Sequence, residues 1–545
     1  MEINKMDAAQ LAKAFLAGAK SLESQQEYIN ELNVFPVPDG DTGTNMTMTI
    51  MSAAREVAAI ENPEMKTVCK AISSGSLRGA RGNSGVILSQ LFRGFTKVVK
   101  TQDEITVAIL AEACEKGCET AYKAVMKPKE GTILTVARGA ADKALELADS
   151  TDDIVFFLEE VLKEAEDVLA KTPDMLPVLK QAGVVDSGGQ GLVQVLRGAL
   201  DYLSGKEVDL SVDSAEKKET KVETSKYAYA MSYRIALTSA LADKKKAEYT
   251  AFVEKIGGDV KLSISSDSVK TSMLTNDPGF VLSKALAYGA LFDMEIKNIS
   301  GESLSSSASQ SENTPVEPEK KEDEPRKKMG FIAVSIGEGV NSIFRELGAD
   351  YIIEGGQTMN PSTDDILNAV EQVNADTIFV LPNNKNIILA ANQAVDLCED
   401  KKLVVIPTKT IPQGITAIIN YIPDETVEEN KDRMVEEIAN VKTGQVTYAV
   451  RDTVIDDKEI CKGDYMGIGD AGILAVNKDI TIAFIDMLKE MVDDDSSIIS
   501  VYYGQDANEA DAQKLVDEIQ GTFPGIEIEL QNGGQPVYYY VCSVE

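Results

Sequence analysis

The sequence contains no histidine among its 545 residues. Without histidine, no imidazole can act as a general acid or base, ligate a metal, or complete a Ser-His-Asp triad. Any chemistry must therefore rest on carboxylates, lysine, arginine, tyrosine, hydroxyl groups and bound metal.

Paired cysteines and long apolar runs are also missing. The six cysteines are scattered and form no Cys-x-x-Cys pair: Cys69, Cys114, Cys118, Cys398, Cys461 and Cys542. Neither a disulfide framework nor a thiolate zinc site is indicated. No apolar stretch approaches the roughly 18 residues that cross a bilayer, and the N-terminus has no basic-then-apolar signal. We expect a cytoplasmic protein that is not an integral membrane protein.

Positive charge is scarce, with 54 Lys and Arg against 88 Asp and Glu and a net charge of −34. This balance opposes binding to nucleic acid or anionic lipid unless a local basic patch compensates. The sequence shows no such patch, so we expect no nucleic-acid partner. A content of 43% hydrophobic residues allows real cores, and about 150 residues per domain predicts three or four domains.

Helical periodicity extends over residues 1–204. An amphipathic helix is expected over 7–30, with Asp7 and Gln10 as a capping box. Further helices are expected near 44–59, 64–74, 83–100, 105–125, 132–148, 153–171, 173–182 and 188–203. No alternating strand interrupts them, so we predict an all-α domain of about eight helices. Residues 205–225 are charged and aperiodic, as expected of a linker.

The composition then changes twice. Strands are expected at 226–238, 259–265 and 269–275, and helices at 241–256 and 279–290, which predicts a small α+β middle domain over 226–300. Residues 301–328 are rich in Ser, Glu, Lys and Pro and are expected to be a disordered linker.

Residues 329–545 alternate short apolar runs with helical stretches. Over 329–440 this βαβα pattern predicts a parallel sheet covered by helices. Strands at 444–451, 480–485, 497–503, 526–531 and 537–543, with helices near 485–493 and 509–520, predict a second α/β unit over 441–545.

One loop of the helical region has the composition of a metal site: Asn33-Val-Phe-Pro-Val-Pro-Asp-Gly-Asp-Thr-Gly-Thr-Asn-Met46. Asp39 and Asp41 flank Gly40, so both carboxylates can converge on one hard cation such as Mg²⁺. The small residues that follow offer N–H groups at an expected helix start, which suits phosphate oxygens. The alternative is an ordinary surface turn.

Three other glycine-rich segments precede helices: Gly79-Ala-Arg-Gly-Asn-Ser-Gly85, Glu130-Gly-Thr-Ile-Leu134 and Gly183-Val-Val-Asp-Ser-Gly-Gly-Gln-Gly191. Each alone is better explained as a helix cap, with Thr132 either a cap or a phosphate ligand. In an antiparallel bundle alternate loops lie at the same end, so several could surround one ligand. Asp186 could then face a sugar or an adenine.

Standard nucleotide signatures are absent from the sequence. It has neither the Gly-x₄-Gly-Lys-Ser/Thr loop nor the catalytic motifs of protein kinases. Gly467-Ile-Gly-Asp-Ala-Gly472 spells a dinucleotide fingerprint, but strand-like residues follow it where a helix is required. We interpret this segment as a tight turn between strands.

Taken together, the four loops resemble those of the kinase subunit of bacterial fatty acid kinase. The likeness continues through Glu354-Gly-Gly-Gln-Thr-Met-Asn-Pro361, Leu381-Pro-Asn-Asn-Lys-Asn386, Ile406-Pro-Thr-Lys-Thr-Ile-Pro-Gln-Gly414 and Gly533-Gly-Gln-Pro-Val-Tyr538. In that family the N-terminal domain is similar to the ATP-binding subunit of dihydroxyacetone kinase, a barrel of eight antiparallel helices.

The resemblance implies that ATP binds the helical domain with Mg²⁺ held by Asp39 and Asp41. Relatives have a third aspartate where the nearest residue here is Asn33, and often a histidine at the position of Thr42. The candidate nucleotide-binding residues are Thr42, Thr44, Asn45, Met46, Gly82, Asn83, Ser84, Gly85, Thr132, Asp186 and Gly188. Arg81 is the candidate cation at the transferred phosphoryl group, with Arg78 and Arg138 as alternatives and a solvated surface arginine as the other interpretation.

The resemblance also implies a substrate and partners. The family phosphorylates a fatty acid presented by a separate carrier protein and forms an acyl phosphate; the C-terminal region looks like the carrier-docking part, and a homodimer is expected. A carboxylate nucleophile is already ionised near neutral pH and needs no strong base, which suits a protein without histidine. Two alternatives are a kinase of a small polyol or ketone such as dihydroxyacetone, and a nucleotide-sensing scaffold without turnover.

The middle domain departs from the family pattern. Many members have a Cys and two His residues there that suggest a bound metal, where this sequence has Ala230, Ser272 and Leu274. No metal can bind through those side chains, so we expect a role in dimerisation or domain positioning.

Overall fold

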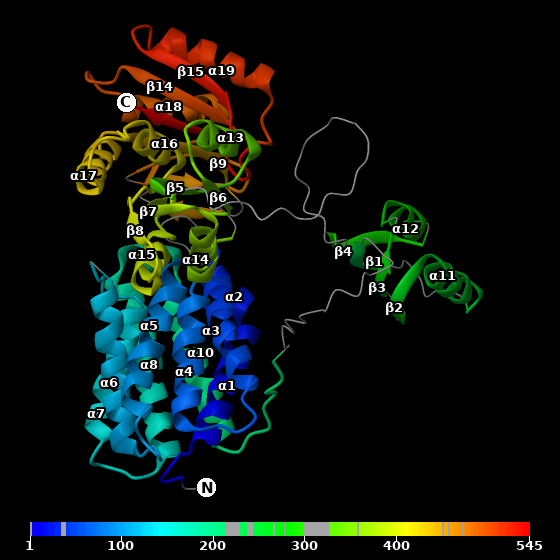
Figure 1. Ribbon diagram of the computed structural model, residues 1–545, viewed down its shortest axis with the longest axis vertical. Helices are drawn as coiled ribbons and strands as arrows, with labels where there is room; N and C mark the ends of the chain where they lie inside the picture. Colours follow the sequence, from blue (N-terminus) through cyan, green and yellow to red (C-terminus); the bar gives the residue numbers. More distant parts are fainter. Residues whose placement is uncertain are drawn as a thin grey trace. The chain divides into compact units, whose positions relative to one another are not determined.

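The computed structural model describes residues 3–33, 40–125, 127–212, 229–236, 243–264, 268–276, 278–286, 288–298, 326–356, 359–449, 452–455, 458–470 and 472–545. It divides into two compact units, Met1–Ser214 with Asp323–Glu545, and Ala215–Glu322 (Figure 1). Asp39 and most of both predicted linkers lie outside the described residues.

The N-terminal part is helical, as predicted. Its helices are α1 (Ala8–Ser24), α2 (Gln26–Leu32), α3 (Thr42–Ala58), α4 (Met65–Arg78), α5 (Gly82–Val99), α6 (Val107–Ala124), α7 (Ile133–Leu147), α8 (Ile154–Met175), α9 (Pro177–Ala182) and α10 (Ser187–Leu203). The capping box of Asp7 and Gln10 is present at the start of α1. The predicted helix over 7–30 is divided at Gln25, where α1 ends and α2 begins.

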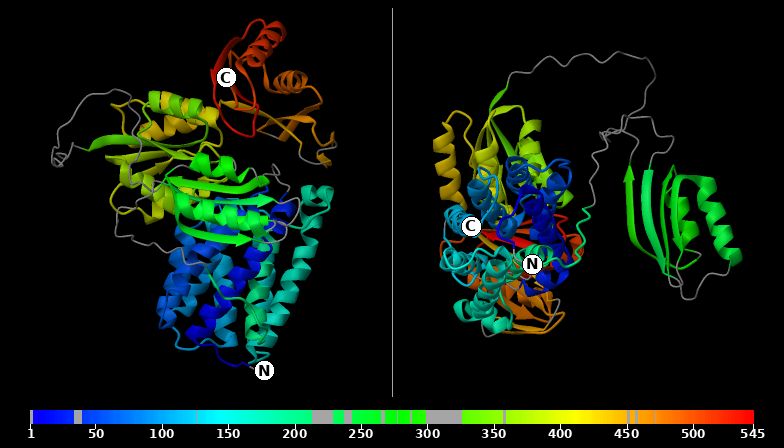
Figure 2. Two further views of the ribbon diagram at one scale, coloured as in Figure 1. Left: turned by 90° about the vertical axis from the view of Figure 1, so that its right-hand side faces the viewer. Right: turned by 90° about the horizontal axis from the view of Figure 1, so that it is seen from below.

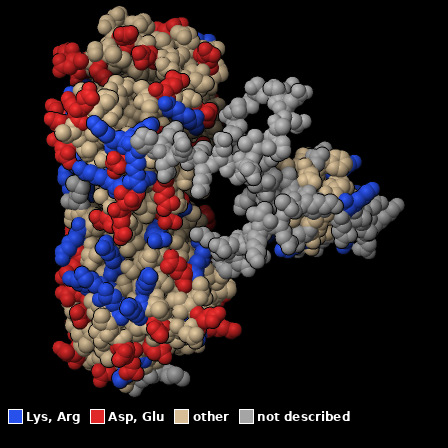
Figure 3. All heavy atoms as spheres, viewed as in Figure 1, with Lys and Arg blue, Asp and Glu red and all other residues tan. Residues whose placement is uncertain are grey.

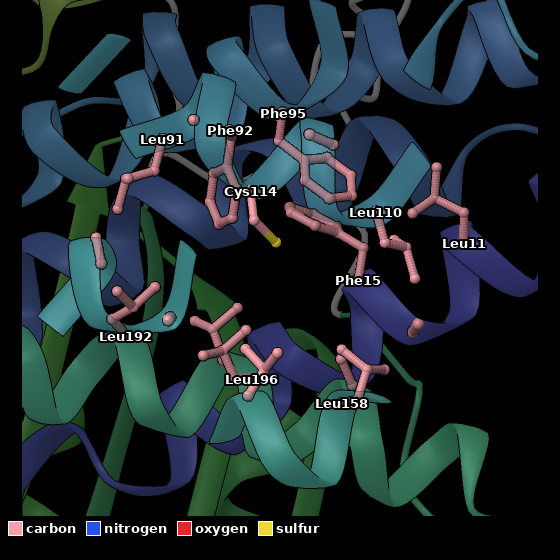
Figure 4. A pocket seen from close by; sticks show the side chains of 18 of the residues that line it. Leu11, Phe15, Leu91, Phe92, Phe95, Leu110, Cys114, Leu158, Leu192 and Leu196 are labelled. Carbon is pink, nitrogen blue, oxygen red and sulfur yellow. The ribbon is translucent and has the colours of Figure 1, made fainter. Parts of the chain in front are cut away.

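The long helices pack in chain order. From α3 to α8 each packs against the next, and α10 packs on both α8 and α1, while α1 also packs on α3. An apolar cavity of about 180 Å³ lies inside, lined by side chains that include Phe15, Phe92, Phe95 and Cys114 (Figure 4). Burial raises the pKa of Cys114 to about 12, so this thiol stays protonated.

The second unit contains an antiparallel sheet and two helices. Its elements are β1 (Tyr229–Ala236), α11 (Asp243–Ile256), β2 (Gly257–Ile264), β3 (Ser268–Thr275), α12 (Pro278–Ala285) and β4 (Ala290–Asn298), in the strand order β2-β3-β1-β4. Both helices cover one face, where Met231 and Ile235 of β1 join one apolar cluster with Val253 and Val281 (Figure 2). The sequence prediction included the first three strands and missed β4.

The C-terminal region begins with the predicted parallel sheet. Its elements are β5 (Lys327–Ser335), α13 (Glu338–Glu346), β6 (Tyr351–Glu354), α14 (Thr363–Gln372), β7 (Ala375–Leu381), α15 (Ile388–Leu397), β8 (Lys402–Val405), α16 (Ile411–Ile419) and α17 (Val427–Ile438), in the strand order β6-β5-β7-β8. All its strand pairs are parallel. Helices α16 and α17 were not predicted.

A six-stranded sheet completes the chain. Its elements and the accompanying hairpin are β9 (Lys442–Tyr448), β10 (Thr453–Ile455), β11 (Lys458–Ile460), β12 (Tyr465–Gly469), β13 (Gly472–Asn477), α18 (Ile480–Met491), β14 (Ile498–Tyr503), α19 (Glu509–Thr522), β15 (Glu527–Asn532) and β16 (Tyr540–Val544), in the sheet order β13-β12-β9-β16-β14-β15. It shares an apolar cluster with the parallel sheet through Phe331, Tyr502 and Tyr538. The fingerprint-like segment lies where β12 ends and β13 begins, and these two strands pair antiparallel. This agrees with our interpretation of the segment as a turn between strands.

The strand predicted over 480–485 is wrong, because these residues form the first half of α18. The Asp479 carboxylate accepts hydrogen bonds from the N–H groups of Thr481 and Ile482 and starts the helix. The β-branched residues of this run favour a strand in isolation, but the cap and packing on β9, β12 and β13 outweigh that preference.

The expectation of no basic patch is also wrong. A hollow of about 570 Å³ beside α4 and α5 is lined by six exposed basic side chains: Lys66, Lys70, Arg78, Arg93, Lys97 and Lys100. None of the six forms a salt bridge with another described residue, and basic side chains gather over these helices in Figure 3. Their spacings of four and eight residues along α4, and of four and three along α5, place them on one face of each helix, and the packing of α4 on α5 joins the two faces.

Within the part of the chain that the structure describes, no helix combines the length and the apolar character needed to cross a bilayer.

Candidate functional site

The four predicted loops lead into α3, α5, α7 and α10, and the structure brings these helix starts together in pairs. Arg81 N, before α5, donates to Thr49 Oγ1 of α3 (3.2 Å). Gly191 of α10 lies against the thioether of Met46 in α3. Gly188 of α10 lies against Ile133, the first residue of α7. The helix starts therefore adjoin in the order α5, α3, α10, α7.

Asp41 is the N-cap residue of α3 and its carboxylate is partly buried. Asn360 Nδ2 donates to Asp41 Oδ2 over 2.7 Å, and Asn45 forms a second side-chain hydrogen bond with the same carboxylate. Burial raises the pKa of Asp41 above its ordinary value, while the bonds from Asn45 and Asn360 oppose that rise. A bound cation would stabilise the ionised form of this partly desolvated carboxylate.

Arg81 is not a solvated surface arginine, since its side chain is only 18% exposed. Its Nη1 donates to the carbonyl oxygen of Asn360 (2.8 Å), and its Nη2 lies 3.1 Å from Asp365 Oδ2. The alternative Arg138 is paired with Glu130 and stacks over the Tyr122 ring. Arg78 belongs to the basic hollow. Of the three arginines, Arg81 alone contacts the residue that holds Asp41.

The loop backbone depends on glycine where α3 and α5 meet. Gly82 has φ +56°, and a Cβ there would lie 2.5 Å from Asn45 Nδ2. A side chain at Gly43 would lie 2.2 Å from the carbonyl oxygen of Gln26. The close approach at Gly82 keeps the N-termini of α3 and α5 adjacent, whereas the one at Gly43 packs α3 against α2. N–H groups at the two adjacent N-termini can bind phosphate oxygens.

The remaining predicted residues of α3 and α5 differ in their surroundings. Thr44 is bonded to Asn30 through both its backbone N–H and its hydroxyl group, and Met46 is fully buried in the core. Asn83 Nδ2 donates to Asn386 Oδ1 of the C-terminal region (3.3 Å). Thr42 is buried at the first position of α3. Ser84 and Gly85 lie in the first turn of α5.

Asp186 and Thr132 lie at the starts of α10 and α7. The Asp186 carboxylate accepts from Gly189 N (2.7 Å) and from the backbone of Ile133, so it ties the two helix starts together. Burial raises the pKa of Asp186 to about 6. Thr132 caps no N–H with its side chain, and its hydroxyl group donates to Lys129 O. These bonds give Asp186 a structural task whether or not it contacts a ligand.

The described donors fit a hard divalent cation such as Mg²⁺. Asp41 supplies a carboxylate and Asn45 a neutral amide oxygen, which are the ligand types that Mg²⁺ prefers, while Asn360 Nδ2 donates to Asp41 and lies 3.5 Å from Asn45 Oδ1. Among the described residues, no three Asp, Glu or Cys side chains cluster as a metal site. A complete site would need Asp39, which lies outside them, or water. Asn33 is buried at the end of α2.

Sequence reasoning missed the contribution of the C-terminal region to this site. Asn360 and Asp365 lie in and after the loop between β6 and α14, and Arg81 forms an antiparallel bridge with Ser362. Thr363 N donates to Ala80 O (3.1 Å). The motif that contains Asn360 is part of the family likeness, but nothing in it indicates Asp41 as its partner.

In the middle unit, the three positions at which the family pattern led us to expect metal ligands adjoin one another. Ala230 of β1 pairs with Leu274 of β3, and Ser272 is two residues away on the same strand. These residue types supply neither a thiolate nor an imidazole.

Two family models match the chain, and the first defines its class. The model described as DAK2 domain matches residues 36–201, the helical region. The second model, FakA-like, describes the C-terminal part of a fatty acid kinase subunit and matches residues 330–545. The helical region is thus that of a DAK2-type kinase.

A curated relative matches over the whole length of the chain. The chain is 42% identical to Protein YloV of Bacillus subtilis (strain 168), over 100% of both chains. This protein belongs to the FakA-like family of fatty acid kinase subunits.

Two solved structures show weaker likeness. The dihydroxyacetone kinase of C. freundii in complex with AMP-PNP and Mg²⁺ is 18% identical, covering 36% of this chain and 34% of that one, with a TM-score of 0.29. The fatty acid kinase B3 protein of Streptococcus pneumoniae loaded with linoleic acid is 15% identical, covering 40% of this chain and 99% of that one, with a TM-score of 0.28. Values this low leave the functional interpretation to the family and the site.

Proposed function

We propose that the protein transfers the γ-phosphoryl group of ATP to the carboxylate of a fatty acid, presented by a separate fatty-acid-binding carrier, and forms an acyl phosphate. One observation carries the proposal. Asp41 and Arg81 of the DAK2-type region converge, and both are bonded to Asn360 of the region that matches the fatty acid kinase model. Membership of the kinase family supports the same reaction.

In this proposal Asp41, Asp39 and Asn33 hold Mg²⁺, and N–H groups at the starts of α3 and α5 bind the phosphates. The position of Thr42, Asn45, Gly82 and Asn83 at these two helix starts supports that role. When bound, Mg²⁺ supplies charge neutralisation at the phosphate oxygens. The eight long helices act as the barrel that presents these loops.

The reaction requires little proton chemistry. A fatty acid oxygen, already ionised, forms a bond to the γ-phosphorus while the bond to the bridging oxygen breaks and ADP leaves. Arg81 would stabilise the charge on the transferred phosphoryl group. To do so, its guanidinium group must release the carboxylate of Asp365 and bind a phosphate oxygen instead. The chain's own task is to position groups and exclude water.

We further propose roles for the other parts of the chain. The C-terminal region docks the carrier, and the middle unit mediates homodimerisation without a metal. A reducing compartment such as the cytoplasm suits six cysteines that are all free thiols.

The test is turnover with defined acceptors. The full-length protein is incubated with ATP, Mg²⁺ and oleate, with and without a purified fatty-acid-binding carrier, and ADP release is measured. We expect ADP release that depends on both lipid and carrier. ATP consumption that is independent of both would contradict the proposal, and turnover with dihydroxyacetone alone would favour the polyol kinase alternative.

A further inference from the structure

One residue of the C-terminal region contacts both candidate catalytic groups of the helical region. Asn360 donates its side-chain N–H to Asp41, and its backbone carbonyl oxygen accepts from Arg81. Its Nδ2 also lies 3.5 Å from Asn45 Oδ1. These partners come from two different loops, so Asn360 links the predicted metal ligand to the predicted phosphoryl-binding cation.

The structure fixes Asn360 closely. The residue is 4% exposed. Two residues later, Ser362 and Asp365 form a capping box that starts α14, and Asp365 also pairs with Arg81. On the other side, Gly355 and Gly356 have φ of +152° and +105°, and Asn384 Nδ2 donates to Gly356 O. The chain is anchored before and after Asn360, and its buried side chain is oriented by the hydrogen bond to Asp41.

A separate set of contacts joins the same two regions away from Asp41. Gln393 of α15 donates to Leu77 O at the end of α4, and Gln90 of α5 donates to Gln393 Oε1 (3.1 Å). Ala80 and Val86 of the helical region belong to the apolar core of the parallel sheet. The association therefore has its own apolar and polar support, and Asn360 is not required merely to hold the regions together.

We propose that Asn360 is a positioning residue of the phosphotransfer site, which orients the Asp41 carboxylate for Mg²⁺·ATP and places Arg81 beside it. The site is then built from both regions of the chain. The assignment of Mg²⁺·ATP rests on the proposed function, while the link between Asp41, Asn360 and Arg81 rests on the contacts above.

The physical reason lies in the buried hydrogen bond. A charged group in a partly desolvated position depends on its hydrogen-bond donors, and loss of the Asn360 donor leaves the Asp41 carboxylate free to rotate. Partners that orient a metal-ligating side chain commonly change metal affinity or activity by 10–100-fold when removed. Gln393 offers a matched control, since it is a buried amide at the same association and its hydrogen bonds go to other partners than Asp41.

The experiment compares full-length wild type, N360A and Q393A by calorimetric titration with a non-hydrolysable ATP analogue, with and without Mg²⁺. For N360A we expect the Mg²⁺-dependent gain in affinity to fall about 10–100-fold, with Mg²⁺-free affinity unchanged. Q393A should lower the melting temperature and retain the gain. The inference would be overturned if N360A kept the full Mg²⁺-dependent gain in affinity, or if Q393A lost as much of that gain as N360A.

Two additions keep the outcomes separate. If N360A does not fold, the isosteric N360D removes the same donor and must alter the Mg²⁺ dependence; an unaltered dependence refutes the inference. Acyl phosphate formation is measured in parallel. A wild type that forms none, with N360A still impaired in Mg²⁺-dependent binding, contradicts the proposed function alone. If wild type forms acyl phosphate normally and N360A keeps the full Mg²⁺-dependent gain in affinity, the role of Asn360 is contradicted and the proposed function is not.

Discussion

Among single residues, Asp41 is the side chain on which the proposed Mg²⁺ site depends most. D41N keeps the shape and removes the charge that would hold Mg²⁺, so acyl phosphate formation should fall by about 10²–10³-fold, as expected when one preorganised electrostatic group is lost. The melting temperature of D41N should equal or slightly exceed that of wild type, because burial disfavours the ionised Asp41.

The control for D41N is D153N. Asp153 caps α8 and also accepts from the N–H of Ile3, and neither of these partners belongs to the site. This variant should retain activity. Full activity in D41N would remove Asp41 from the metal site.

Asp186 provides a prediction on pH. Its pKa is raised from 3.8 to about 6, so the folded state binds the proton more tightly than the unfolded state. This contribution to stability is present below about pH 4 and is lost as the pH rises through 6. Asparagine is an equally good N-cap without the charge. In D186N the melting temperature at pH 7 should match or exceed that of wild type, and the decline between pH 4 and 6 should be shallower; a parallel decline in both proteins would be the contrary result.

Among the helix termini, a comparison of alanine variants at Gly82 and Gly183 distinguishes the effect of backbone strain from the effect of a steric contact. Both have positive φ, +56° and +67°, but a Cβ at Gly82 meets Asn45 whereas one at Gly183 meets nothing within 4 Å. G183A should cost about 1 kcal/mol of stability and leave activity intact. G82A should cost more and also impair activity through Asn45 and Asp41. Denaturant unfolding and turnover check both, and equal activities in the two variants would contradict the role of this contact.

The helices of the N-terminal region could be predicted from the sequence because their signals are local. Apolar periodicity and caps such as Asp7 mark them, and α3 to α8 begin within about two residues of the predicted positions. Residues 480–485 show the limit, since their β-branched side chains conceal a helix whose start depends on Asp479. The contact between Asn360 and Asp41 spans 319 positions, so no local pattern could indicate it.

At the scale of the whole molecule, the six thiols report on packing. Cys461 is exposed, whereas burial raises the pKa of Cys69, Cys114 and Cys542 to about 12. Thiol titration of the native protein should show a fast reaction that is absent in C461S, no reaction of Cys69, Cys114 and Cys542, and all six thiols reacting after denaturation. Fast reaction of Cys69, Cys114 or Cys542 in the native protein would contradict this packing.

The distribution of charge also belongs to this scale. A chain with a net charge of −34 exposes six basic side chains together beside α4 and α5. The net charge alone does not predict this patch, because helix packing brings six of the 54 Lys and Arg residues together.

We propose that the helical and C-terminal regions together build one site for acyl phosphate synthesis. Hydroxylamine traps the acyl phosphate product, so it is added to wild type and D41N with ATP, Mg²⁺ and carrier-bound oleate. The account predicts oleoyl hydroxamate from wild type in amounts that match ADP released, and almost none from D41N or without the carrier. Release of ADP by wild type with no hydroxamate would contradict it.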